Sequence, residues 1–76
     1  MVQKNLKNSS NKMKWTDIHN IAIELEDLYP QKDIININFT ELQKLVLDIH
    51  GFNDDPKRCN EKILEAIQMA WLDERE

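Results

Sequence analysis

The chain has 76 residues, which is the length of one small domain. Fourteen acidic side chains stand against ten basic ones, so the net charge is −4 at pH 7, and 41% of the residues are hydrophobic. This balance is typical of soluble globular proteins, and no run of about 18 apolar residues predicts a membrane span. The single cysteine excludes an internal disulfide or a thiolate zinc site, and the single glycine excludes phosphate-binding loops.

The first residues differ in composition from the rest of the chain. Residues 1–14 contain four lysines and no acid, and they are otherwise rich in Asn and Ser. Because few of these side chains are apolar, burial does not offset the entropy of ordering them, and we expect residues 1–13 to be a disordered basic tail. A targeting segment and an arm that contacts an acidic partner are the alternatives. The predicted domain is the acidic helical segment 14–76, in which residues 15–76 carry six bases and all fourteen acids, a net charge of −8.

Residues 15–30 predict the first helix. Thr16 or Asp17 is expected to cap its amino end, where an acid also suits the positive end of the helix dipole. Apolar residues then recur three or four positions apart until Pro30 ends the pattern. They are Ile18, Ile21, Ala22, Leu25, Leu28 and Tyr29. We therefore expect an amphipathic helix that buries this stripe.

The connection over residues 31–38 alternates in the manner of a strand. Ile35, Ile37 and Phe39 are separated by Asn36 and Asn38, and a period of two favours a half-buried strand. One strand does not form a sheet. We therefore expect this extended piece to pack on the helices or to pair with another short extended segment.

A second helix is predicted to start at Thr40. Thr40 is its expected cap, and Gln43 three positions later completes the spacing of a capping box. Gly51 supplies the stop signal. The apolar face of this helix consists of Leu42, Leu45, Val46 and Ile49.

A third helix follows the turn that contains Asp54 and Asp55. Asp55 before Pro56 is typical of an N-cap followed by proline at the first helical position, and Asn60 gives a second start signal, so we expect an irregular first turn. The apolar face consists of Ile63, Leu64, Ile67, Ala70 and Trp71. Three such faces around one centre predict a mainly α, small three-helix domain with a short extended segment.

No arrangement of residues predicts catalysis. His19 and His50 lie on different predicted helices, and neither has a partner at metal-ligand spacing. Cys59 follows Arg58 near a helix start, which is a setting that can activate a thiol, but we interpret it as a small residue packed at that position. We therefore expect no enzymatic activity.

The carboxylates are the remaining signal. Capping explains single residues such as Asp17 and Asp55, but the excess of acids over residues 15–76 favours a negatively charged surface that attracts a cationic partner. Carboxylates also offer hard oxygen ligands to divalent or ferric ions. The same charge argues against DNA binding, because phosphate contacts need Lys and Arg.

Several short motifs occur in a fixed order over residues 14–74. They are Lys14-Trp15-Thr16-Asp17, Leu25 with Asp27, Tyr29-Pro30 with Asp33, Phe39-Thr40, Phe52 with Asp54-Asp55-Pro56, the block 60–67, and the closing block 71–74. From Lys14 to Glu74 they span about four fifths of the chain. This ordered set resembles the IscX family of iron–sulfur cluster assembly proteins.

The resemblance implies a helical domain related to the winged-helix type and no catalysis. It implies an acidic adaptor that binds the cysteine desulfurase IscS, competes there with frataxin and ferredoxin, and modulates sulfur delivery. It further implies weak binding of iron by surface carboxylates. We expect a cytoplasmic monomer that contacts neither nucleic acid nor membrane. A simple iron-binding or iron-donor protein is the alternative, followed by a winged-helix nucleic-acid-binding domain.

Charge and resemblance together give two sets of candidate residues, chosen by residue type. The candidate iron ligands are Asp17, Asp27, Asp33, Asp48, Asp54 and Asp55. The candidate partner-binding acids are Asp17, Glu24, Asp27, Asp33, Glu41, Asp48, Asp54, Asp55, Glu61 and Glu65.

Four positions depart from the pattern of the family. Gln31 and Asn53 stand where the family usually has aspartates, Ile34 stands where it has proline, and Cys59 stands where it has serine. The two missing acids leave fewer carboxylates on the surface that is expected to bind cations. This weakens the expectation of iron binding more than that of desulfurase binding.

Overall fold

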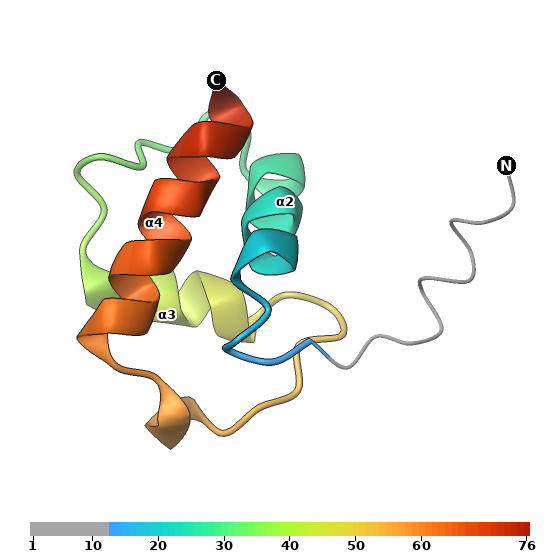
Figure 1. Cartoon of the computed structure of the whole chain (residues 1–76). Helices are drawn as coiled ribbons and strands as arrows, with labels where there is room; N and C mark the ends of the chain where they lie inside the picture. The colour runs from blue at the N-terminus through green and yellow to red at the C-terminus, as the bar shows by residue number, and fades with distance from the viewer. Residues whose placement is uncertain (1–12) are drawn as a thin grey trace, which may run out of the picture.

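The computed structural model describes residues 13–76, so residues 1–12 of the basic tail predicted over residues 1–13 lie outside the described part of the chain. Its elements are α2 (Ile18–Leu28), α3 (Phe39–Leu47), the 3-10 turn η1 (Pro56–Arg58) and α4 (Glu61–Arg75). α2 and α4 pack side by side, and α3 crosses behind their amino-terminal ends (Figure 1). The mainly α prediction is confirmed, and the relation to the winged-helix type stays a prediction.

α2 begins and ends where the apolar stripe predicts, between Asp17 and the Tyr29-Pro30 pair. The predicted side-chain cap is wrong. Asp17 occupies the N-cap position, but its Oδ2 accepts from the backbone N–H of Lys14 at 2.9 Å. The backbone N–H of Asp17 also donates to the Lys14 carbonyl at 2.9 Å, and this tight turn directs the carboxylate backwards, away from the helix.

The predicted strand over residues 31–38 is wrong, because the chain makes a turn there. The carboxylate of Asp33 accepts from the backbone and side-chain N–H groups of Asn36 at 3.2 and 2.8 Å. Ile34 and Ile37 are buried, whereas Ile35 is 71% exposed. The buried isoleucines are therefore three residues apart and not two. The Asp33 and Asn36 side chains close a turn, and the alternation of apolar and polar residues does not indicate such a turn.

The N-cap of α3 lies two residues before the predicted one. Asn38, not Thr40, is the N-cap, and its Oδ1 accepts from the Glu41 backbone N–H at 2.8 Å. Both residue types cap helices, so the prediction chose the wrong one of two adjacent signals. The Gln43 side chain donates to the Pro56 carbonyl at 3.2 Å rather than reaching back to the cap. Gly51 has φ 95° in the turn after the helix, a conformation that favours glycine.

Both predicted starts of the last helical segment are confirmed. Asp55 Oδ1 accepts from the Lys57 backbone N–H at 3.0 Å, with Pro56 as the first residue of η1. Asn60 Oδ1 accepts from the Ile63 backbone N–H at 2.9 Å and caps α4. Because η1 and α4 have separate caps, the first turn is irregular, as predicted.

The core combines most of the three predicted apolar faces with residues from the connections, but the prediction that Leu28 is buried is wrong, because this last residue of α2 is 50% exposed. The buried side chains of the core are Trp15, Ile21, Ala22, Leu25, Ile34, Ile37, Leu42, Val46, Ile49, Leu64, Ile67 and Trp71. Trp15 packs edge-on against Phe52, with ring centroids 4.7 Å apart. The aromatic residues at the ends of elements therefore close the core.

One carboxylate joins the carboxyl-terminal ends of α2 and α4. Glu26 Oε1 accepts from the indole N–H of the fully buried Trp71 at 2.9 Å and from Nε of Arg75 at 3.0 Å. The guanidinium of Arg75 also donates to the backbone carbonyls of Tyr29 and Lys32. α3 lies near the amino-terminal ends of α2 and α4 (Figure 1). The hydrogen bonds among Glu26, Trp71 and Arg75 therefore join these two helices at the end that α3 does not reach.

We expect Glu26→Ala to lower the free energy of unfolding by about 1–3 kcal/mol, because the buried indole N–H of Trp71 loses its acceptor. Glu26→Gln keeps an acceptor and should cost less. Urea unfolding followed by tryptophan fluorescence measures both. Glu24→Ala on the same helix is the control, and an equal loss in the control would contradict this role for Glu26.

Candidate functional site

The ten candidate partner-binding acids are distributed over the molecule and do not converge at one point. α2 carries Glu24 and Asp27, and α4 carries Glu61 and Glu65. Glu41 lies in α3, and Asp48 is the C-cap of that helix. The remaining four, Asp17, Asp33, Asp54 and Asp55, lie in turns and connections.

Two candidate acids, Asp54 by its carboxylate and Asp55 by its backbone carbonyl, hold the start of the folded chain against the turn before η1. Asp54 Oδ2 accepts from the Trp15 backbone N–H at 3.1 Å, and the Trp15 indole N–H donates to the Asp55 carbonyl at 2.8 Å. Met13 pairs with Phe52 in a parallel bridge beside this contact. Together with the Asp17–Lys14 turn, these bonds show that the acids of the first and fifth motifs fix the backbone.

Two aspartates have lowered pKa values because they accept hydrogen bonds. The side-chain amide of Asn36 lowers the pKa of Asp33, and the backbone N–H of Trp15 lowers the pKa of Asp54. The carboxylate of Asp54 is also only 11% exposed. Both carboxylates therefore stay anionic at neutral pH while they accept hydrogen bonds from backbone N–H groups.

The thiol of Cys59 is not activated. Burial raises its pKa, which is the opposite of what a nucleophilic or metal-binding thiolate needs. The structure therefore favours the interpretation of Cys59 as a small residue packed beside the core.

The lowered pKa of Asp54 predicts a loss of stability in acid. Its folded-state pKa lies below the unfolded value of about 3.9, so its contribution is complete above that value and disappears as the pH falls through the folded-state pKa. We expect Asp54→Asn to be less stable than the wild type at neutral pH and to lose less of its remaining stability on acidification.

Urea unfolding at a series of pH values from neutral to strongly acidic tests this prediction. Asp27→Asn, on the exposed side of α2, is the matched control and should keep the wild-type profile. Parallel profiles for Asp54→Asn and the wild type would show that this carboxylate does not contribute.

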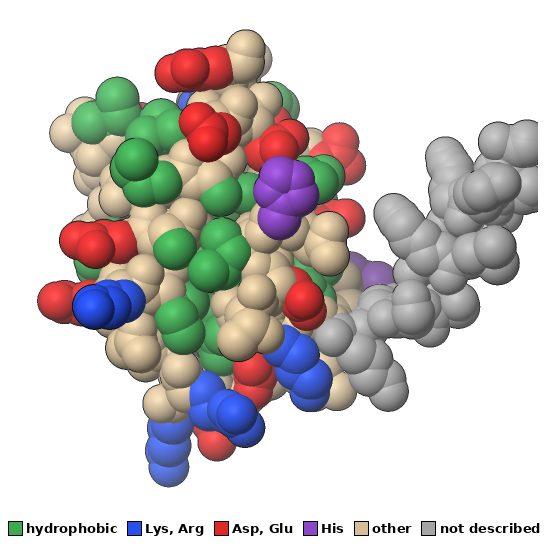
Figure 2. All heavy atoms as spheres, in the orientation of Figure 1, with side chains coloured by type: hydrophobic (Ala, Val, Ile, Leu, Met, Phe, Trp, Pro, Cys, Tyr) green, Lys and Arg blue, Asp and Glu red, His purple; other side chains and the backbone are tan. Residues whose placement is uncertain are grey.

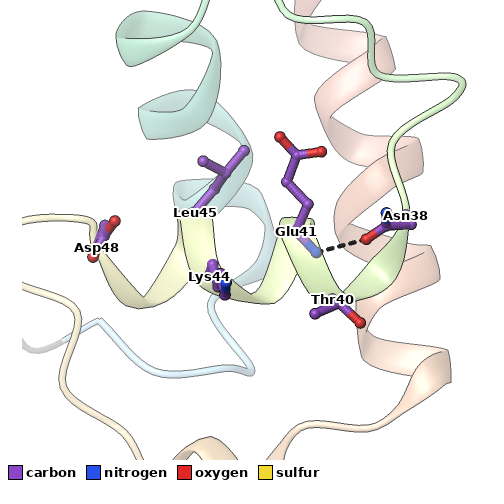
Figure 3. Close-up of a pocket in the computed structure, with 6 residues that line it drawn as sticks. All are labelled: Asn38, Thr40, Glu41, Lys44, Leu45 and Asp48. Atoms are coloured by element: carbon purple, nitrogen blue, oxygen red, sulfur yellow. Dashed lines mark hydrogen bonds between the residues drawn. The ribbon is translucent and has the colours of Figure 1, made fainter.

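A shallow depression on α3 is open to solvent and has mixed charge. It is lined by Asn38, Thr40, Glu41, Lys44, Leu45 and Asp48. Glu41 and Asp48 lie toward its opposite ends, with Lys44 between them (Figure 3). Lys32 also forms an ion pair with Glu41. Because the two acids are separated and partly compensated, the depression does not combine them into one anionic site.

The candidate iron ligands are similarly separated. Within residues 13–76, no group of three or more His, Cys, Asp or Glu side chains is placed to hold a metal ion. Asp17, Asp33, Asp54 and Asp55 use their carboxylates in hydrogen bonds to backbone N–H groups. Asp27 and Asp48 are exposed. Iron binding at these residues stays a prediction, with few protein ligands for each ion.

Charge is distributed unevenly on the face shown in Figure 2. Acidic side chains gather toward the end where α2 and α4 finish, and most Lys and Arg side chains lie toward η1 and the start of α4. The acids at the end of α4 include Asp73 and Glu74, which are exposed. The sequence-based candidate set did not include them, although the helix continues to Arg75. The spacing of Trp71 and Arg75, one helical turn apart, is the signal that predicts the continuation.

The described residues contain no membrane-crossing helix. Among residues 13–76 the longest helix is α4, with 15 residues. No helix in this range is long and apolar enough to span a bilayer.

Residues 13–76 match the family model described as iron-sulphur cluster assembly. The chain is also 47% identical over 64 residues to an uncharacterized protein of Pseudomonas aeruginosa, PA3808, an alignment that covers 84% of this chain and 97% of the relative. The motifs that resemble IscX therefore lie inside the matched segment. This chain belongs to the iron–sulphur cluster assembly family, which includes IscX.

Proposed function

We propose that this protein is a non-enzymatic adaptor of iron–sulphur cluster assembly that binds the cysteine desulfurase IscS in the cytoplasm and modulates sulfur delivery. Family membership supports the role in cluster assembly. The observation that carries the finer proposal is the net charge of −8 over residues 15–76. In this proposal the acids meet lysines and arginines on the desulfurase, and frataxin and ferredoxin compete for the same basic patch.

The structure supports an electrostatic contact because several cations are already engaged within the protein. Lys32 pairs with Glu41, and Arg75 pairs with Glu26 at 3.0 Å. By contrast, Asp27, Glu65, Asp73 and Glu74 are exposed. Exposed charges act over roughly 10 Å at moderate salt, so they speed encounter and give an affinity that falls as salt rises.

Neutralising four exposed acids should weaken the complex. We expect the variant Asp27→Asn, Glu65→Gln, Asp73→Asn, Glu74→Gln to bind the purified desulfurase about tenfold less tightly at low salt, from roughly 0.2–1 kcal/mol for each charge. Its affinity should also change less between low and high salt than that of the wild type. Isothermal titration calorimetry measures both quantities.

Removal of cations from the opposite end provides the matched control. Lys57→Gln with Lys62→Gln alters two exposed charges near η1 and should not weaken the complex. If the wild type forms no detectable complex at low salt, the proposed function is wrong.

We propose that iron binds weakly at separate surface carboxylates. In a titration with ferrous iron, NMR signals near Asp27 and Asp48 should broaden before those near Asp54, whose carboxylate is occupied by two backbone N–H groups. Asp27→Asn with Asp48→Asn should reduce the early broadening. Tight, stoichiometric iron binding without a desulfurase complex would instead favour the simple iron-binding or iron-donor protein.

A further inference from the structure

Two of the most exposed large apolar side chains lie near one flank of α4. Ile35 is 71% exposed and Met69 is 63% exposed. Leu72, three positions after Met69 and therefore on the same helical flank, is half-buried. Figure 2 shows hydrophobic side chains gathered over α4 and the neighbouring connection. We call Ile35, Met69 and Leu72 the apolar patch.

The turn before α3 is fixed against this flank of α4. The side-chain amide of Gln68 donates to the Ile34 carbonyl at 2.9 Å and to the Ile35 carbonyl at 3.5 Å. Ile34 is 2% exposed, so the turn directs this residue into the core and its neighbour Ile35 to solvent. The exposure of Ile35 is therefore held in place by the fold and does not come from a free loop.

Acids surround the apolar patch. Glu65, Met69, Leu72 and Glu76 follow one another four, three and four positions apart, which places them on one stripe of α4 with an acid at each end. Asp33 closes the turn that carries Ile35, and Asp73 follows Leu72. The nearby cation Arg75 is engaged with Glu26 and with backbone carbonyls.

We propose that the apolar patch receives an apolar side chain that is flanked by lysines or arginines on a partner protein, and that it anchors the desulfurase contact. This inference rests on the proposed function. The acids around the patch favour a partner that carries lysines or arginines beside its apolar side chain. A second copy of this chain would bring the same acids against those around the patch, and an anionic lipid surface would be repelled by them.

The acids and the patch then make separable contributions to binding. The contribution of exposed charges to the binding free energy is screened by salt. The contribution of buried apolar surface is not weakened by moderate salt. Affinity that persists at high salt would come from the patch.

The test compares two pairs of exposed apolar residues in the full chain. We expect Ile35→Asn with Met69→Gln to weaken binding to the purified desulfurase about tenfold at both low and high salt, with an unchanged salt slope. Ile23→Gln with Leu28→Gln changes two residues of α2 that are 41% and 50% exposed, and it should change the affinity less than twofold. Thermal unfolding by circular dichroism is expected to show that both variants stay folded.

The outcomes separate this inference from the proposed function. If the wild type forms the complex and the patch variant binds as tightly as the control, the patch proposal is overturned while the adaptor function stands. A lack of any wild-type complex at low salt overturns both. A concentration-dependent dimer of the wild type that the patch substitutions abolish would overturn the proposal by identifying a second copy as the occupant.

Discussion

The hydrogen bonds of Glu26 to α4 are the interaction on which the arrangement of this molecule depends. A buried indole N–H needs an acceptor, and Trp71 has Glu26 as its acceptor because α2 and α4 lie side by side at their carboxyl-terminal ends. Arg75 then joins the same carboxylate and reaches the connection after α2. The exposed acids at the end of α4 and the turn that carries Ile35 are both positioned by this contact.

The acids of this protein divide into two groups that residue type does not distinguish. Asp17, Asp33, Asp54 and Asp55 accept backbone hydrogen bonds, and they lie in turns where a short carboxylate reaches nearby N–H groups. Acids on the exposed sides of helices have no such local role and remain available to a partner. Counting carboxylates therefore overstates the binding surface, because part of the negative charge is committed to folding.

The sequence predicted the helical faces and the starts of η1 and α4, but it missed the caps of α2 and α3, the turn closed by Asp33, and the contacts between distant residues. Helical spacing placed the apolar faces, and the Asp55-Pro56 and Asn60 signals placed the starts of η1 and α4. The strand prediction failed because the Asp33–Asn36 bonds and the Gln68 amide overrule the alternating pattern. The contacts of Glu26 with Trp71 and of Asp54 with Trp15 join residues about 40 positions apart, and no local pattern indicates such pairs.

The departures of this chain from the family pattern bear on how it would dock. Ile34, which stands where the resemblance to IscX implies proline, fills the core, and the following Ile35 is directed outward, with its carbonyl near the Gln68 amide. Where the family usually has an aspartate, Gln31 is neutral and exposed. The chain thus has less charge near this turn than the resemblance to IscX implies. A contact built on it would draw less of its affinity from screened charges, so salt should weaken it less than a contact made by acids alone.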